Sequence, residues 1–184
     1  MPRCSWVNLN NPIYVAYHDK EWGQPLHDDQ ALFELLCMET YQAGLSWETV
    51  LNKRQGFRSA FFDYDIQSVA EMTVQELENL LMNPAIIRHR AKVYATRTNA
   101  QAFLRVQSEF GTFDRYLWSW VDVTPLSNPV NSARELLTKN DLSERLSRDL
   151  KKRGFTFVGP VCIYSYLQAS GVIQEHEISC DFYK

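Results

Sequence analysis

Apolar residues recur at helical rather than alternating spacing along most of the chain. The segment from about 30 to 38 carries a broad apolar stripe, and Asp28 and Asp29 precede it as capping residues. Thr73 and Glu76 have the spacing of a capping box ahead of a further apolar run. We therefore expect one helix from about residue 30 and another that begins after Thr73.

The second half of the chain continues this helical pattern. Asn83-Pro84 ends the helix that follows Thr73, and a long helix is expected over about 88–110. The segment 142–153 has leucines at four-residue spacing and ends in basic residues, which is typical of an amphipathic helix. Pro160 suits the first turn of a last helix, which Gly171 ends.

Strand patterns are weak by comparison. The chain has no convincing alternating β-branched segment bounded by turns, and we expect an ordered turn over 154–159. No repeat or flexible linker divides the chain, and 184 residues suffice for one domain, with or without a small lobe. The predicted fold class is all-α.

Composition limits the class of protein. The hydrophobic fraction of 45% and the charged fraction of 22% are those of a globular protein, and the aromatic fraction of 13% leaves surplus rings that either pack or bind something. Neither a membrane-length apolar run nor a signal peptide is visible, so we expect a cytoplasmic protein with no membrane partner. A net charge of −3 argues against a broadly basic nucleic-acid coat but leaves a local DNA-binding patch open.

Cysteines and histidines near both ends of the chain are the first candidate site. Free thiols or a metal are favoured over disulfides in a cytoplasmic protein. The i, i+4 spacing of His176 and Cys180 would place both on one helical face, and Cys4 and His18 would complete a closed, structural Cys₂His₂ site. Spacing alone leaves open that the four residues are unrelated, because Cys4 and His18 lack the spacing of a standard zinc finger.

A second candidate site surrounds Glu39. This residue follows an apolar helix face, so its carboxylate is either buried beside Trp47 or turned to solvent. Tyr14, Tyr17 and Trp22 are available to complete an aromatic pocket with one acid. Such a pocket suits a flat, cationic or amine-bearing heterocycle, which would stack on the rings and donate hydrogen bonds to the carboxylate. The residues alone leave both alternatives open.

A third candidate site is the turn and helix start at 83–92. Free backbone N–H groups at a helix start, followed at once by Arg88, Arg90 and Lys92, form a combination that can hold a phosphate group. A solvated basic helix face explains the same residues equally well.

Taken together and in order, these segments resemble the 3-methyladenine DNA glycosylase I family. The matching stretches are Cys4-Ser5-Trp6, 14–23, 32–34, 42–47, 86–90, 152–155, Gly159-Pro160 and 176–180. They cover nearly the whole chain, and the QAGLSW segment at 42–47 and the terminal cysteines and histidines are its most specific parts.

The resemblance implies an all-α helix-hairpin-helix DNA glycosylase fold over residues 1–184. It further implies a zinc-clasped lobe that the two chain ends form, from about 1–25 and 155–184. By motif match, the ligands of this structural zinc ion are Cys4, His18, His176 and Cys180.

The resemblance also assigns roles around the second candidate site. Glu39 matches the family's base-recognising carboxylate and is the catalytic candidate, although water activation by it would be secondary to recognition. Trp47 matches the stacking ring, while Tyr14, Tyr17 and Trp22 are further substrate-binding aromatics.

The remaining matches concern DNA. Gly44 and Leu45 fall where a residue contacts the gap left by a flipped nucleotide. The phosphate-binding hairpin corresponds to 85–92, and its candidate DNA contacts are Ile87, Arg88, Arg90 and Lys92. Ala85 and Ala91 stand at positions where glycine would let the backbone approach DNA closely. These two alanines depart from the family pattern, so the resemblance is less specific for this turn than for the pocket.

The implied function is DNA repair. The enzyme would be a monomeric N-glycosyl hydrolase that flips 3-methyladenine out of double-stranded alkylated DNA and releases it as the free base. Two alternatives are a damage sensor, which binds the lesion without breaking a bond, and a zinc-stabilised protein-interaction domain, which binds no DNA. Release of free base from alkylated DNA separates them.

Overall fold

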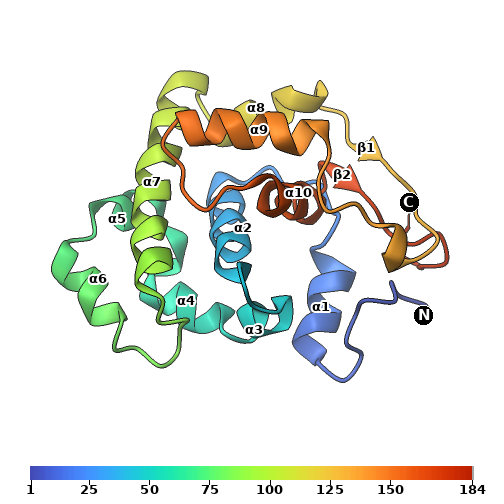
Figure 1. Ribbon diagram of the computed structural model, residues 1–184, viewed down its shortest axis with the longest axis horizontal. Coiled ribbons are helices and arrows are strands. Elements are labelled where there is room, and N and C mark those ends of the chain that lie inside the picture. Colours follow the sequence, from blue (N-terminus) through green and yellow to red (C-terminus); the bar gives the residue numbers. More distant parts are fainter. Residues whose placement is uncertain (184) are drawn as a thin grey trace.

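The computed structural model describes residues 1–183 and is mostly helical (Figure 1). The helices are α1 (Pro12–Lys20), α2 (Asp29–Gln42), α3 (Trp47–Asn52), α4 (Arg54–Ala60), α5 (Ile66–Glu71), α6 (Val74–Leu80), α7 (Arg90–Phe110), α8 (Phe113–Trp118), α9 (Asp141–Lys152) and α10 (Pro160–Ala169). Short 3-10 turns are η1 (Phe62–Tyr64), η2 (Ser119–Val121) and η3 (Ala133–Glu135), and the strands are β1 (Leu126–Ser127) and β2 (Ile173–Gln174). Lys184, the last residue of the predicted lobe, lies outside the described residues.

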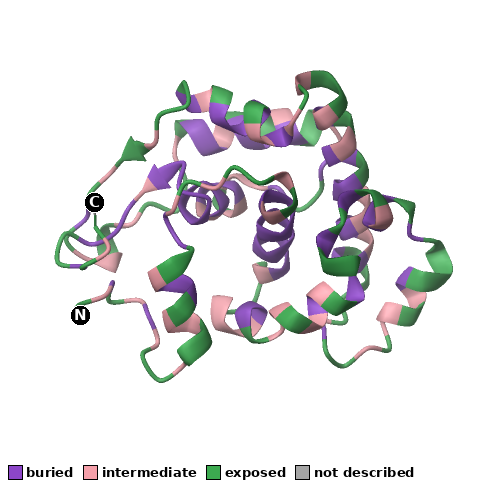
Figure 2. Cartoon of the chain, turned by 180° about the vertical axis from the view of Figure 1, so that it is seen from behind, coloured by how far each residue is buried: buried purple, intermediate pink, exposed green. Residues whose placement is uncertain are grey.

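Helix α2 runs through the middle of the molecule (Figure 1). The Asp28 side chain accepts a hydrogen bond from the Ala31 backbone, as expected of a capping residue, and the helix continues beyond the predicted end to Gln42. Every residue from Leu32 to Tyr41 is buried, so the apolar stripe belongs to a helix that is covered on all sides (Figure 2). A polar side chain on this helix therefore faces the interior.

The other predicted helix starts agree closely with the structure. Thr73 and Glu76 form the reciprocal capping box of α6. The long helix α7 begins at Arg90, where the His89 side chain caps it, and α9 begins after Asn140. Pro160 opens α10, as expected, and 154–159 is a turn region without strands.

A small parallel sheet was not expected. Strand β1 pairs with β2 in the register Leu126 to Ile173, and Val130 forms an isolated bridge with Glu177. This pairing holds 173–177 extended, so His176 and Cys180 do not lie on one helical face; that prediction is wrong. The chain reverses in a turn instead, in which the Cys180 backbone N–H donates to the Glu177 carbonyl at 2.8 Å.

The two ends of the chain lie side by side. The Asp181 backbone N–H donates to the Pro2 carbonyl at 3.0 Å, and Figure 1 shows both ends on the same side of the molecule. Within residues 1–183, no helix is both long enough and apolar enough to cross a membrane.

Candidate functional site

A cavity of about 150 Å³ opens beside the C-terminal half of α2. Its walls combine aromatic rings with a few polar side chains: Trp6, Tyr14, Tyr17, Trp22, Glu39, Gln42, Trp47, Leu136, Ser165 and Gln168. The structure thus brings together all of the residues that the sequence suggested for a base pocket. We call this space the base cavity.

Local structure holds the aromatic walls in place. Helix α1 presents Tyr14 and Tyr17 at i, i+3, so both side chains project from the same side of the helix. Trp47 is the first residue of α3, and its ring centroid lies 5.3 Å from that of Tyr17. Trp6 contacts Trp22 with 4.9 Å between centroids. Such packed rings form rigid walls for a flat ligand.

Glu39 brings an acid to this cavity. Its side chain is 5% exposed, and Oε2 has no hydrogen-bond partner among residues 1–183; the same holds for Trp47 Nε1. Burial raises the pKa of Glu39 to about 8. Because buried polar atoms normally have partners, an unpartnered acceptor and donor on one cavity wall indicate a polar ligand.

A wider groove of about 480 Å³ adjoins the base cavity and shares Glu39, Gln42 and Ser165 with it. Gly44 and Leu45 lie on its rim, immediately after α2 ends. Gly44 has a φ of +77°, a conformation that favours glycine, and Leu45 is 40% exposed. The turn therefore holds an apolar side chain at the edge of the groove.

The segment predicted as the phosphate-binding hairpin, 85–92, covers most of the turn between α6 and α7 and the first residues of α7. In the turn, Ile87 is half-buried and Arg88 is exposed. The exposed Arg90 guanidinium pairs with Glu78 at 2.6 Å. Close approach of this turn to the core depends on Gly56 in α4, because a Cβ there would lie 2.3 Å from the Ala85 carbonyl oxygen.

Lys92 differs from the expected surface contact with DNA. It is 5% exposed, and its Nζ donates to the Tyr41 carbonyl at 2.9 Å and to the Ala43 carbonyl at 2.6 Å. The ammonium group satisfies the carbonyls at the end of α2, so it is unavailable to a phosphate. Lys92 thus supports the turn that carries Leu45.

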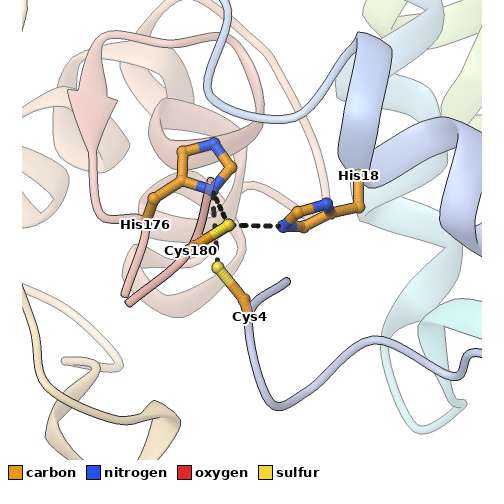
Figure 3. Close-up of side chains that lie close together, drawn as sticks. All are labelled: Cys4, His18, His176 and Cys180. Carbon is orange, nitrogen blue, oxygen red and sulfur yellow. Dashed lines mark hydrogen bonds between the residues drawn. The ribbon is translucent and has the colours of Figure 1, made fainter. Parts of the chain in front are cut away.

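The predicted metal ligands converge on one point (Figure 3). Cys4, His18, His176 and Cys180 are all buried, and one ligand atom from each lies within 4.8 Å of the others. His176 Nδ1 lies 3.4 Å from Cys4 Sγ and 3.7 Å from Cys180 Sγ, while His18 Nε2 lies 3.6 Å from Cys180 Sγ. Ligands of a tetrahedral zinc ion stand roughly 3.3–3.8 Å apart, given Zn–S of about 2.3 Å and Zn–N of about 2.0 Å. The donor set therefore fits zinc.

Groups around the cluster support this fit. His18 Nδ1 lies 2.8 Å from Asp19 Oδ1, which leaves Nε2 directed at the cluster. Arg3 donates two hydrogen bonds of 2.7 Å to the same carboxylate. A carboxylate behind a histidine ligand is a common way of fixing its tautomer and orientation.

The sequence did not single out Leu136, Ser165 or Gln168, which also line the base cavity. Ser165 and Gln168 lie on α10 at i, i+3. Polar residues within an otherwise apolar helix were the available signal. Leu136 comes from the loop after η3, where no periodic pattern exists.

Known proteins resemble this chain over its whole length. Residues 6–184 match the family described as methyladenine glycosylase. The DNA-3-methyladenine glycosylase of Haemophilus influenzae is 43% identical over 97% of this chain and 96% of its own, and DNA-3-methyladenine glycosylase 1 of Escherichia coli is 43% identical over 100% and 97%.

Solved structures give the same result. A crystal structure of 3-methyladenine DNA glycosylase I covers 100% of both chains at 42% identity, with a TM-score of 0.96. A variant of 3-methyladenine DNA glycosylase I in complex with 3-methyladenine also has a TM-score of 0.96, at 38% identity over 100% of this chain and 98% of its own. The chain belongs to the methyladenine glycosylase family.

Proposed function

We propose that the protein is a DNA glycosylase that excises 3-methyladenine from alkylated double-stranded DNA, with the base cavity as its active site. The observation that carries this proposal is the Glu39 carboxyl group, which is buried among aromatic rings and whose Oε2 has no hydrogen-bond partner within residues 1–183. Family membership supports it, because the curated relatives are named for this activity. Trp47, Tyr14, Tyr17 and Trp22 would hold the flat base from its faces and edges.

The reaction hydrolyses one N-glycosidic bond. Methylation at N3 gives the adenine ring in DNA a positive charge, so the bond from C1′ to N9 breaks with its electron pair moving to the base. The base leaves as neutral 3-methyladenine, a water oxygen bonds to C1′, and the water's proton passes to solvent. Because the lesion is already a good leaving group, extrusion of the base and its selection are the protein's main tasks.

Glu39 serves first in selection. With a pKa of about 8, its carboxyl group holds a proton at neutral pH in the free protein. A cationic ring that donates N–H groups favours the ionised carboxylate, and this preference discriminates against neutral adenine. Binding of the cation alone would not accelerate cleavage, so Glu39 acts catalytically only to the extent that its contacts strengthen in the transition state.

Two surfaces outside the cavity would engage DNA. Leu45, displayed by Gly44 on the rim of the adjoining groove, would enter the gap that the flipped nucleotide leaves. Ile87, Arg88 and Arg90, at the turn between α6 and α7, would lie along the phosphates as in a helix-hairpin-helix element. Lys92 is left out of this interface because of its burial.

We also propose that Cys4, His18, His176 and Cys180 hold a structural zinc ion. Zinc would stabilise a lobe formed by about 1–25 and 155–184, and a site with four protein ligands leaves no position for a reacting water. The chain's own residues would then carry out base selection and DNA binding.

The direct test is incubation with methylated duplex DNA, followed by chromatography of the released bases. Free 3-methyladenine is expected from the parent protein and much less from Glu39→Gln. A protein that binds methylated DNA but releases no base would instead be a damage sensor, and absence of both binding and release would favour an interaction domain.

A further inference from the structure

Glu175 is a fully buried carboxylate that no part of the proposed reaction uses. Three neutral side chains donate hydrogen bonds to it: the Tyr164 hydroxyl at 2.5 Å, the Asn128 amide and the Gln168 amide. Tyr164 lies one helical turn before Gln168 on α10. Asn128 comes from the residue after β1, where its backbone N–H donates to Gln174 at 3.0 Å. The small sheet thus delivers Glu175 and one of its donors to α10.

This arrangement fixes which way round the Gln168 amide lies. A carboxylate that receives donors on both oxygens offers lone pairs only, so it binds the amide nitrogen and not the amide oxygen. Nε2 of Gln168 donates to Glu175 Oε2, and Oε1 is the atom left over. Among residues 1–183, nothing donates a hydrogen bond to Gln168 Oε1. Gln168 lines the base cavity together with Glu39.

We propose that Gln168 selects the base by presenting Oε1 as an acceptor to its exocyclic amino group, and that Glu175 is the positioning residue that keeps the amide from turning over. This inference rests on the proposed function and identifies a part of its substrate preference. A 6-amino purine donates N–H groups at that edge, whereas a 6-oxo purine brings a carbonyl oxygen against a fixed acceptor. Mismatched acceptors in a buried site are costly, so discrimination should be strong.

The test compares the affinities of free 3-methyladenine and 3-methylhypoxanthine, which differ at the position-6 edge. Quenching of the cavity tryptophans reports binding of either base. Gln168→Met keeps the length of the side chain and removes the acceptor, so the Kd for 3-methyladenine should rise about tenfold, as for one lost hydrogen bond in a buried site. The Kd for 3-methylhypoxanthine should fall, because its carbonyl oxygen no longer meets an acceptor. Glu175→Gln lets the Gln168 amide turn, so affinity for 3-methylhypoxanthine should rise and the ratio of the two Kd values should narrow.

Gln107→Met is the matched control. Gln107 also donates through its amide to a carboxylate, Asp29 Oδ2 at 2.6 Å, but it does not line the base cavity. It should lose stability without a change in the Kd ratio. An unchanged ratio of the two Kd values in Gln168→Met would overturn the proposal. If Glu175→Gln does not fold, the ratio measured for Gln168→Met decides alone. Parent protein that shows the preference but releases no base from DNA would refute only the excision activity.

Discussion

The Glu39 carboxyl group makes the stability of the protein depend on pH. Its pKa is raised from 4.5 to about 8 because the group is buried. Between these values the folded protein holds a proton at Glu39 that the unfolded chain has released. The free energy of unfolding therefore falls as pH rises through this window, and the loss is complete above the folded-state pKa.

We expect Glu39→Gln to remove this pH dependence. The parent should lose up to roughly 4 kcal/mol between pH 4.5 and pH 9 from this group, whereas the variant should lose none from it. Urea unfolding of both proteins across this range measures the difference, which should grow with pH in favour of the variant. Parallel stability curves would mean that Glu39 is solvated and ionised in the folded protein.

The sequence alone does not determine the surroundings of several site residues. Glu39 was expected either in a pocket or in solvent. It lies in the pocket, because the helix that carries it, α2, is covered on all sides there. Lys92 was grouped with Arg88 and Arg90 because the three are neighbours in a basic run. Lys92 lies four residues before the buried Thr96 and so on the same side of α7, unlike the exposed Arg88 and Arg90. The helical periodicity therefore indicated burial, but the positive charge led to the prediction of a surface contact. The orientation of the Gln168 amide depends on Glu175, which follows β2 and accepts a hydrogen bond from that amide in the folded chain.

At the level of elements, the turn after α2 connects a buried helix to the rim of the groove that adjoins the base cavity. Leu45 projects from this turn beside the base cavity, and unstacking a base pair step costs a few kcal/mol that an apolar wedge offsets. Leu45→Ala is expected to slow excision from duplex DNA by about tenfold while the Kd for free 3-methyladenine stays near that of the parent. Equal losses in both measurements would assign Leu45 to the core instead.

Variants of Lys92 and Arg88 should distinguish support of the turn after α2 from binding of DNA phosphates. Lys92→Met removes two hydrogen bonds to the end of α2, so we expect a loss of about 1.5–3 kcal/mol in stability and an unchanged salt dependence of duplex binding. Arg88→Ala should leave stability unchanged and lower the slope of log K against log salt by about one. Denaturation and binding titrations at several salt concentrations measure both; a lower slope for Lys92→Met would return it to the DNA interface.

Elements with local signals were predictable and those without were not. The capping box at Thr73 and the proline at 160 are local, and both mark real helix starts. Strands β1 and β2 are too short for any periodicity, and they form through pairing of segments far apart in the sequence. The turn that brings Cys180 back toward His176 follows from that pairing, which is why the prediction that the two residues share one helical face is wrong.

Over the whole molecule, the base cavity shares a wall with the cluster formed by Cys4, His18, His176 and Cys180. The Trp22 ring lines the cavity on one side and contacts the His176 ring with 4.7 Å between centroids. Trp6 likewise lines the cavity and lies 5.2 Å from His18. A change at His18 or His176 therefore affects the base cavity through the rings of Trp6 and Trp22, which contact both.

Because of this shared wall, base binding should depend on the proposed zinc site. Protein purified without added metal should contain about one zinc ion per chain, and Cys180→Ser should lose it. Because the ion would join both chain ends, its loss should lower the Tm by roughly 10 °C or more, or about 3 kcal/mol for a chain of this size. The Kd for free 3-methyladenine should also rise at temperatures where the variant is folded, since Trp6 and Trp22 lose their backing.

Cys37→Ser provides the control for this experiment, because Cys37 is a buried thiol outside the cluster. It should lose stability through burial of a hydroxyl group but keep its zinc and its affinity for the base. Elemental analysis, thermal unfolding and base titration of the three proteins separate loss of the metal from loss of a buried thiol. Parent protein that contains no zinc and is nevertheless fully stable would refute the zinc site. Loss of zinc without a rise in the Kd for the base would show that the rings of Trp6 and Trp22 hold their positions independently of the residues behind them.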